Sequence, residues 1–244
     1  MTGEGWTQAV RRQLGLGRVL PLGGAADGVW VTESAVDGAL RQMAERVPGV
    51  RLGTVRVALA APDEAGVPAV PAPPSALPPG PLRITAEFAA VAGEPLPAAA
   101  DRLRAALSEA AKGLGLAAGE VDLKVTALLD EADATDEVHP RRTDDPPHSP
   151  PEHPAAEGAD TDEARAERAA LSVPGVTRLT GVLGRAVHIE EPPATDTLPR
   201  RHARVELATD REHRALDVAL AVRTAVGAAL PDRPTVAVLV TEVR

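Results

Sequence analysis

Two histidines in the C-terminal third of the chain are the residues best suited to binding chemistry. In the strands predicted around residues 187–189 and 203–207, the apolar side chains alternate and point to one side. The polar residues left for the other side are His188, His202, Arg204 and Glu206. These four share a polar face if the two strands pair. An exposed cross-strand network is the favoured interpretation, ahead of a ligand site or a metal-dependent hydrolase.

Other arrangements that carry chemistry are missing or have a simpler explanation. The chain has no cysteine, which excludes a thiolate metal site, an iron–sulfur cluster and a cysteine nucleophile. The glycines at 113–119 follow a predicted helix and precede a strand, the reverse of a phosphate-binding loop. The adjacent pair Glu190 and Glu191 precedes a proline and fits a loop better than an acid–base dyad. We therefore predict no enzymatic activity, no cofactor and no metal.

A second candidate contact surface lies near the N-terminus. Trp6, Val10 and Leu14 fall on one face of a short helix, with two arginines beside it. Such a helix can touch a membrane or a membrane-anchored partner, although three turns are too short for stable anchoring. Docking of the helix onto the first domain is the favoured alternative.

The net charge of −9 comes from one segment. Between residues 130 and 163 there are 12 acids and only two bases, together with three histidines and several prolines. This composition predicts a disordered acidic linker. The acidic balance and the 1% aromatic content argue against nucleic-acid binding. The sequence also has neither a signal-peptide pattern nor an apolar run of membrane-spanning length, so we expect a cytoplasmic protein without an integral membrane segment.

On either side of this linker, the apolar pattern predicts the order helix, strand, strand, helix, strand. The tetrapeptide Val-Pro-Gly-Val ends the first helix of each half, at 47–50 and at 173–176. We expect an α+β fold from an internal repeat, with small sheets covered by helices. The predicted domains are residues 1–129, which include an extended proline-rich loop at 62–81, and residues 164–244, separated by the linker 130–163.

Local signals predict where several helices start and stop. Ser34 with Asp37, and Thr209 with Glu212, have the spacing of capping boxes that open a helix. Gly115 is predicted to end the long helix of the first half in a left-handed conformation. Alternation in the first-half strands predicts a solvated outer face, whereas residues 236–243 are apolar on both sides and predict a covered strand.

The chain resembles the alkaline shock protein family, the Gls-like general stress proteins of the bacterial envelope. The resemblance is carried by residues 29–32, 47–50, 94–97, 113–116 and 120–125, and a more diverged copy spans 173–243. It implies a non-enzymatic, cytoplasmic, membrane-associated protein of the envelope stress response. It also implies protein partners, including a small membrane-anchored protein, and homo- or hetero-oligomers. The alternative function is a regulatory module that binds a small ligand between the two halves.

Overall fold

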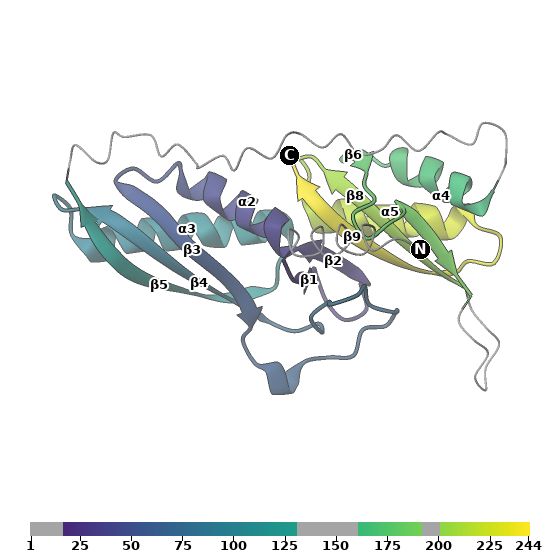
Figure 1. Ribbon diagram of the computed structural model, residues 1–244, viewed down its shortest axis with the longest axis horizontal. Coiled ribbons are helices and arrows are strands. Elements are labelled where there is room, and N and C mark those ends of the chain that lie inside the picture. The colour runs from purple at the N-terminus through teal and green to yellow at the C-terminus, as the bar shows by residue number, and fades with distance from the viewer. Residues whose placement is uncertain (1–16, 131–160, 192–200) are drawn as a thin grey trace, which may run out of the picture.

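The computed structural model describes residues 17–130, 161–191 and 201–244, and these form four α-helices, one short 3₁₀ helix and nine strands (Figure 1). In chain order the elements are β1 (Val19–Pro21), β2 (Val29–Thr32), α2 (Glu33–Ala44), β3 (Val50–Leu59), η1 (Pro62–Glu64), β4 (Leu82–Val91), α3 (Leu96–Leu114), β5 (Ala118–Leu129), α4 (Asp162–Leu171), β6 (Val176–Leu179), β7 (Val187–Glu190), β8 (His202–Thr209), α5 (Ala215–Ala229) and β9 (Thr235–Val243). The predicted α+β class is confirmed.

The first half builds a three-stranded sheet in the order β3-β4-β5. Strand β3 runs antiparallel to the central strand β4, and β5 runs parallel to it. Alternate residues of β4, including Leu82, Ile84 and Phe88, are fully buried. They lie under α2 and α3, which cover one face of the sheet (Figure 1). The opposite face, which we call the outer face, is polar.

The second half repeats this plan within a six-stranded sheet. Strand β8 pairs antiparallel with β6 and β7, which follow one another along its length, and parallel with β9. Helices α4 and α5 pack on one face of this sheet. The order helix, antiparallel strand, central strand, helix, parallel strand therefore occurs in both halves, with β3 corresponding to β6 and β7 together.

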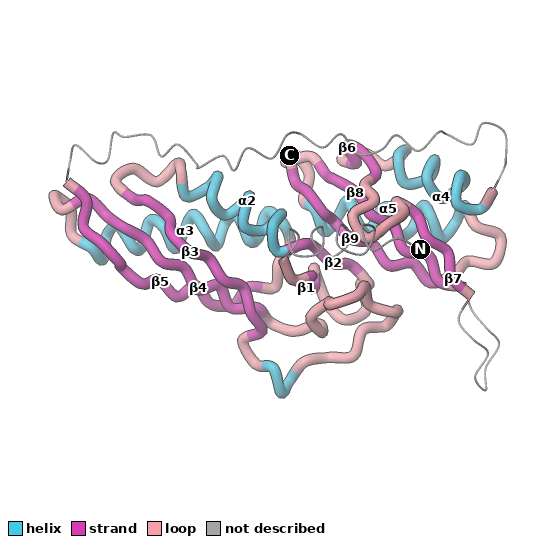
Figure 2. The backbone as a smooth tube through the Cα atoms, in the orientation of Figure 1, coloured by secondary structure: helices cyan, strands magenta, loops and turns pink. Residues whose placement is uncertain are grey.

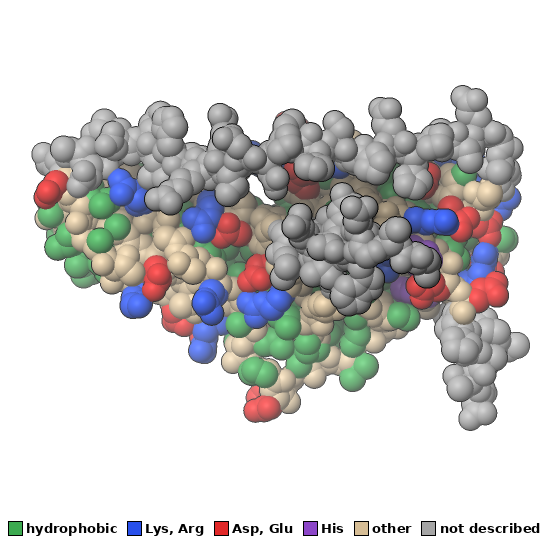
Figure 3. All heavy atoms as spheres, viewed as in Figure 1, with side chains coloured by type: hydrophobic (Ala, Val, Ile, Leu, Met, Phe, Trp, Pro, Cys, Tyr) green, Lys and Arg blue, Asp and Glu red, His purple; other side chains and the backbone are tan. Residues whose placement is uncertain are grey.

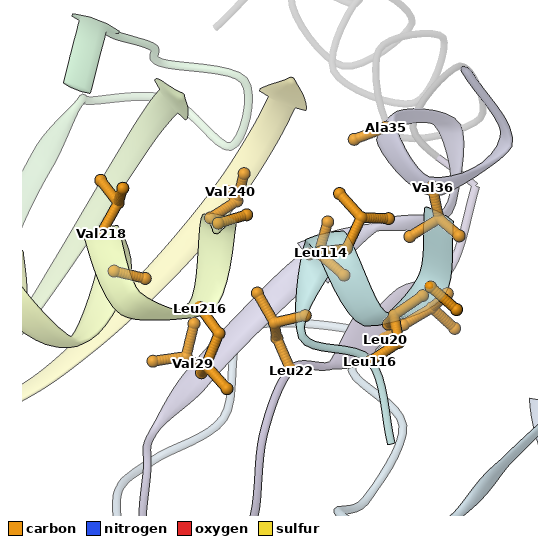
Figure 4. Close-up of a cluster of buried hydrophobic side chains, with 14 of the residues drawn as sticks. Leu20, Leu22, Val29, Ala35, Val36, Leu114, Leu116, Leu216, Val218 and Val240 are labelled. Atoms are coloured by element: carbon orange, nitrogen blue, oxygen red, sulfur yellow. The ribbon is translucent and has the colours of Figure 1, made fainter. Parts of the chain in front are cut away.

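The two halves are joined by a strand that crosses between them. Strand β2, from the first half, pairs in parallel with β9 and carries β1 on its other side. The buried residues of both halves form one continuous cluster. Figure 4 shows the junction, where Leu22 of the first half lies between Leu216 at the start of α5 and Leu114 at the end of α3. The domain limits 1–129 and 164–244 remain a prediction, but the two segments share a core.

Glycines with positive φ end three of the helices or their following turns. Gly115 has φ +90° and is the left-handed C-cap predicted for α3. The two Val-Pro-Gly-Val turns also match, because Gly49 has φ +71° and Gly175 has φ +90°. A residue with a Cβ pays a steric penalty in this region of backbone space, so the repeated turn requires glycine in both halves.

Both predicted capping boxes are wrong. Helix α2 begins one residue before Ser34, and the hydroxyl of Thr32 accepts the capping hydrogen bond from the Ala35 N–H. The Thr32 hydroxyl also donates to the Thr241 carbonyl, 3.1 Å away, so tertiary contact favours this cap. In the second half Thr209 is the last residue of β8, and α5 begins only at Ala215 without a side-chain cap.

The proline loop, residues 62–81, is largely extended, as predicted, but it contains η1 and a turn in which the Ala76 N–H donates to the Pro73 carbonyl (Figure 2). It runs from the three-stranded sheet to the six-stranded sheet, where the Leu77 N–H donates to the Val19 carbonyl at 2.8 Å. Val70 of the loop is 4% exposed and packs in a second apolar cluster with Trp30 and Leu239. The proline loop thus covers the part of the outer face that β1, β2 and β9 form.

Two predictions fall on residues outside the described ranges. They are the N-terminal contact helix with Trp6, Val10 and Leu14, and the disorder of the acidic linker over 131–160. Among the helices that the structure describes, none combines the length and apolar character needed to cross a membrane.

Candidate ligand site between the two halves

The structure brings the predicted polar residues of the second half to one face. His188 on β7 lies directly opposite Arg204 on β8, and Glu190 lies opposite His202. Directly opposed residues in an antiparallel pair project on the same side of the sheet. This is the outer face of the six-stranded sheet, because Arg204 and Glu206 pair in register with Ala237 and Leu239. Figure 3 shows histidine side chains on this part of the surface beside acidic and basic groups.

A cavity of about 160 Å³ lies between these strands and the proline loop. Its lining residues are Pro71, Ala72, Pro73, Pro74, His188, Glu190, His202 and Arg204. One wall therefore comes from the first half and is apolar, whereas the other comes from the second half and is polar. Neither half alone contains both walls.

His202 is held in a fixed orientation at the edge of this cavity. The side chain is buried, and its Nδ1 lies 2.8 Å from the Thr235 hydroxyl. Burial lowers the pKa of His202; the Glu190 carboxylate opposes this effect and the positive charge of Arg204 adds to it. The imidazole is consequently neutral near pH 7. Its Nε2 has no hydrogen-bond partner among the described residues.

The second histidine is paired with its neighbour on the same strand. His188 Nε2 lies 2.7 Å from a carboxylate oxygen of Glu190. Both side chains are partly exposed, at 39% and 60%. Glu190 is the last residue of β7 and lines the cavity, so the prediction that it belongs to a loop is wrong. Its contact with His188 balances its charge at the cavity mouth when that imidazole is protonated.

Arg204 is the cation of the site. Its side chain is 16% exposed, and its Nε lies 3.4 Å from Glu206 Oε1 in a geometry that is not a hydrogen bond. Within the described part of the chain, no hydrogen bond occupies its two terminal nitrogens. A guanidinium that is largely removed from water and incompletely paired favours an anion that can accept from those nitrogens.

Glu206 supports the site from behind and does not line the cavity. It is fully buried, and its Oε2 accepts hydrogen bonds from the Val182 N–H at 2.7 Å and the Leu183 N–H at 3.0 Å. Those amides belong to the excursion between β6 and β7, where the chain leaves the edge of β8. Burial is the main cause of the raised pKa of Glu206, against the opposing effect of these hydrogen bonds. Glu206 therefore holds the excursion between β6 and β7 in place and lies next to Arg204.

The chemistry of the lining residues indicates what kind of molecule the cavity can hold. In the described residues no group of three or more histidine, cysteine, aspartate or glutamate side chains is placed to hold a metal ion. A partly paired guanidinium, a neutral imidazole and a proline wall are instead the components of a site for a small molecule with one anionic group.

Sequence reasoning missed the proline wall, since nothing in residues 71–74 indicates which surface they cover.

Comparisons of the chain with family models, with curated proteins and with solved structures give no match.

Proposed function

We propose that this protein is a regulatory module that binds a small anionic molecule, such as a carboxylate, in the cavity between its two halves. The observation that carries the proposal is the position of Arg204. This arginine is mostly buried, lines a cavity with walls from both halves, and among the described residues has one ion-pair partner, at 3.4 Å. A carboxylate provides the two coplanar acceptors that a guanidinium binds best.

The size of the cavity limits the ligand. A volume of about 160 Å³ is close to that of engineered cavities of roughly 150 Å³ that hold one benzene molecule. Because the pocket is partly open to solvent, this volume limits the part of the ligand that it encloses, which is a single ring or a short chain with a carboxylate at one end. The apolar part lies against Pro71 and Pro73, while the neutral His202 Nε2 provides one directional hydrogen bond.

The location of the cavity suggests how binding is regulatory. The proline loop reaches the site from the first half, and β7 and β8 belong to the second. A ligand that contacts both stabilises the loop on the sheet in proportion to its occupancy. The position of the proline loop, and any surface it covers, then depends on ligand concentration.

The test is a thermal-shift and calorimetric titration of the full chain with benzoate, and with benzamide as its neutral isostere. Benzoate is expected to raise the melting temperature, whereas benzamide has no effect. Arg204→Gln and His202→Ala are expected to abolish the shift, and Arg204→Lys to weaken it because the bidentate geometry is lost. Arg83→Gln, on the outer face of the other sheet, is the matched control and keeps the shift. Equal responses to the acid and the amide, or an undiminished response in a folded Arg204→Gln variant, would contradict the proposal.

A second candidate function is an adaptor of the envelope stress response that gathers near the membrane through protein contacts. It is supported by the resemblance to the alkaline shock protein family and by the outer face of the three-stranded sheet, which no described segment covers. Under this function the protein is cytoplasmic and partly recovered with membranes in cell fractionation. Deletion of a small membrane-anchored partner is expected to release it, and recovery only in the soluble fraction contradicts the adaptor role.

A further inference from the structure

Strand β5 is an edge strand, and no described strand pairs with its outer side. This strand has 12 residues and pairs only with β4. At the opposite side of the same sheet, arginine side chains bind carbonyls of β3: Arg18 donates to the Val57 oxygen at 2.6 Å and Arg41 to the Gly53 oxygen at 3.0 Å. On β5 the one such contact is longer, from Arg104 to the Val121 oxygen at 3.4 Å. An unblocked edge strand is a template for another strand.

The middle of β5 is regular, whereas both ends are not. The pairing with β4 shifts after Ala118 and again after Val125. Between these shifts, Glu120–Val125 pair one to one with Arg83–Phe88. Bulges twist an edge away from an approaching strand, so the segment able to accept a new strand is this regular stretch.

The regular stretch is complementary to itself in charge. Asp122 and Lys124 flank Leu123 and point to the outer face. In an antiparallel pair of identical strands with the two-fold axis at Leu123, each Asp122 lies opposite Lys124 of the second copy. A shift of the register by two residues in one direction places Lys124 against itself, and a shift in the other direction places Asp122 against itself while Lys124 lies opposite Glu120. The register centred on Leu123 is therefore the one of the three in which neither Asp122 nor Lys124 faces its own copy. Opposite charges stabilise such a cross-strand pair and like charges destabilise it.

The same register also brings apolar groups together. Among the described residues, four large hydrophobic side chains are exposed, and two of them, Val125 and Leu128, belong to β5. With the axis at Leu123, Val125 lies opposite Val121 of the second copy, and the two Leu123 side chains meet. Pairing covers apolar surface that a single copy leaves in water.

We propose that two copies of this chain associate through the free edge of β5, in antiparallel register centred on Leu123. The two three-stranded sheets then form one continuous sheet of six strands, with both copies contributing the same surface. Lys124 keeps its ion pair with Glu87, 3.1 Å away, and gains Asp122 of the second copy as a further partner. The interface does not involve the ligand cavity, which lies on the other sheet.

A charge-swap experiment with the full chain tests the register. Lys124→Asp gives two acids in the central triplet and Asp122→Lys gives two bases, so each variant faces like charges in its own dimer. Sedimentation equilibrium over about 1 to 100 µM is expected to show a concentration-dependent dimer for the natural chain. Each variant alone is expected to dimerise at least about tenfold more weakly. An equimolar mixture of the two restores complementarity and is expected to recover dimer at close to the natural affinity.

A cross-link supplies an independent readout, because the chain contains no cysteine. Leu123→Cys places two thiols opposite each other across the axis, at the Cα separation of about 5.5 Å that suits a disulfide. Mild oxidation is expected to give a covalent dimer. Thr54→Cys, on the exposed part of β3, is the control and stays monomeric. A natural chain that remains monomeric over the whole concentration range overturns the proposal. A dimer that Lys124→Asp leaves intact and Leu123→Cys fails to cross-link also overturns it.

Discussion

The two central strands, β4 and β8, occupy equivalent positions and have opposite surroundings. In β4 buried residues alternate with exposed or half-buried ones, such as Arg83 and Glu87. In β8 every residue except Arg204 is buried. Both strands have helices on one face, so the difference arises on the outer face. The proline loop and the excursion between β6 and β7 cover that face of the six-stranded sheet, and no described segment covers that of the three-stranded sheet.

The neighbouring parallel strands follow the same rule. On β5 the outward positions are Asp122 and Lys124, which form surface ion pairs with β4. The corresponding positions on β9 are Ala237 and Leu239, both fully buried. One backbone plan thus supports either a solvated or a buried outer face, depending on whether another part of the chain is long enough to reach it.

Exchanging side chains between the outer faces of the two sheets is expected to give the largest difference in the free energy of unfolding. Leu239→Lys buries an ammonium under the proline loop beside Trp30, where the facing residue on β8 is Glu206, and is expected to lower the free energy of unfolding by about 3 kcal/mol or more, because the desolvation and overpacking outweigh the attraction between the two charges. The reverse change, Lys124→Leu, affects only an exposed ion pair and is expected to change it by about 0.5 kcal/mol or less. Urea denaturation of both variants measures the difference. Similar losses in the two variants would mean that the loop does not seal its sheet.

Removal of a carboxylate from each sheet is the next test. Glu206→Ala leaves the buried N–H groups of Val182 and Leu183 without an acceptor and is expected to cost about 2–4 kcal/mol of unfolding free energy. Glu87→Ala removes a partly exposed partner of Lys124 and is expected to cost about 0.5 kcal/mol or less. Chemical denaturation distinguishes the two variants. A loss of about 0.5 kcal/mol or less in Glu206→Ala would show that Glu206 does not hold the excursion between β6 and β7.

The two Val-Pro-Gly-Val turns sharpen the comparison at identical sequence. A Cβ at Gly175 would lie 2.6 Å from Val218 Cγ2, whereas at Gly49 the nearest atom is 3.7 Å away. Gly49→Ala has only the left-handed backbone penalty, about 1–2 kcal/mol. Gly175→Ala adds overpacking against α5 and is expected to cost about 1–2 kcal/mol more. Thermal melts of the two alanine variants check this order, and a reversed order contradicts the closer packing of the second half.

The smallest expected effect is a pH dependence of the free energy of unfolding that comes from His202 in the second half. The pKa of His202 is lowered from its ordinary value of 6.5, so the unfolded chain binds a proton that the folded chain resists. Stability from this residue is therefore complete above pH 6.5 and is lost as the pH falls toward the folded-state pKa. His202→Gln keeps a partner for Thr235 and is expected to reduce the loss between about pH 7.5 and 5.5. Equal losses in both proteins would show that His202 is not the group responsible.

The local sequence pattern predicted the helices and strands better than it predicted which strands pair with one another. The stripe of α3, its cap at Gly115 and the solvated or covered character of each sheet follow from nearby residues alone. The partner of β2 does not, because Val29–Thr32 are four buried residues with no feature that selects β9. The prediction of the cap of α2 failed for the same reason. Thr32 caps the helix in place of Ser34 because its hydroxyl also donates a hydrogen bond to the Thr241 carbonyl, which is distant in sequence.

The candidate site was predictable in part. Strand alternation was enough to place His188, His202 and Arg204 on one face. It could not separate the cavity residues from Glu206, whose burial depends on the break between β6 and β7. Nor could it identify Pro71–Pro74 as the opposite wall, since that contact joins segments more than a hundred residues apart and is decided by tertiary packing.

The parallel pairing of β2 with β9 has a consequence for synthesis. The Thr32 hydroxyl meets the Thr241 carbonyl across 209 positions of sequence. During translation, β2 and the apolar side chain of Trp30 therefore remain without their partner strand until β9 has been synthesised. A pairing of such large sequence separation is expected to form late and to slow the folding of the six-stranded sheet.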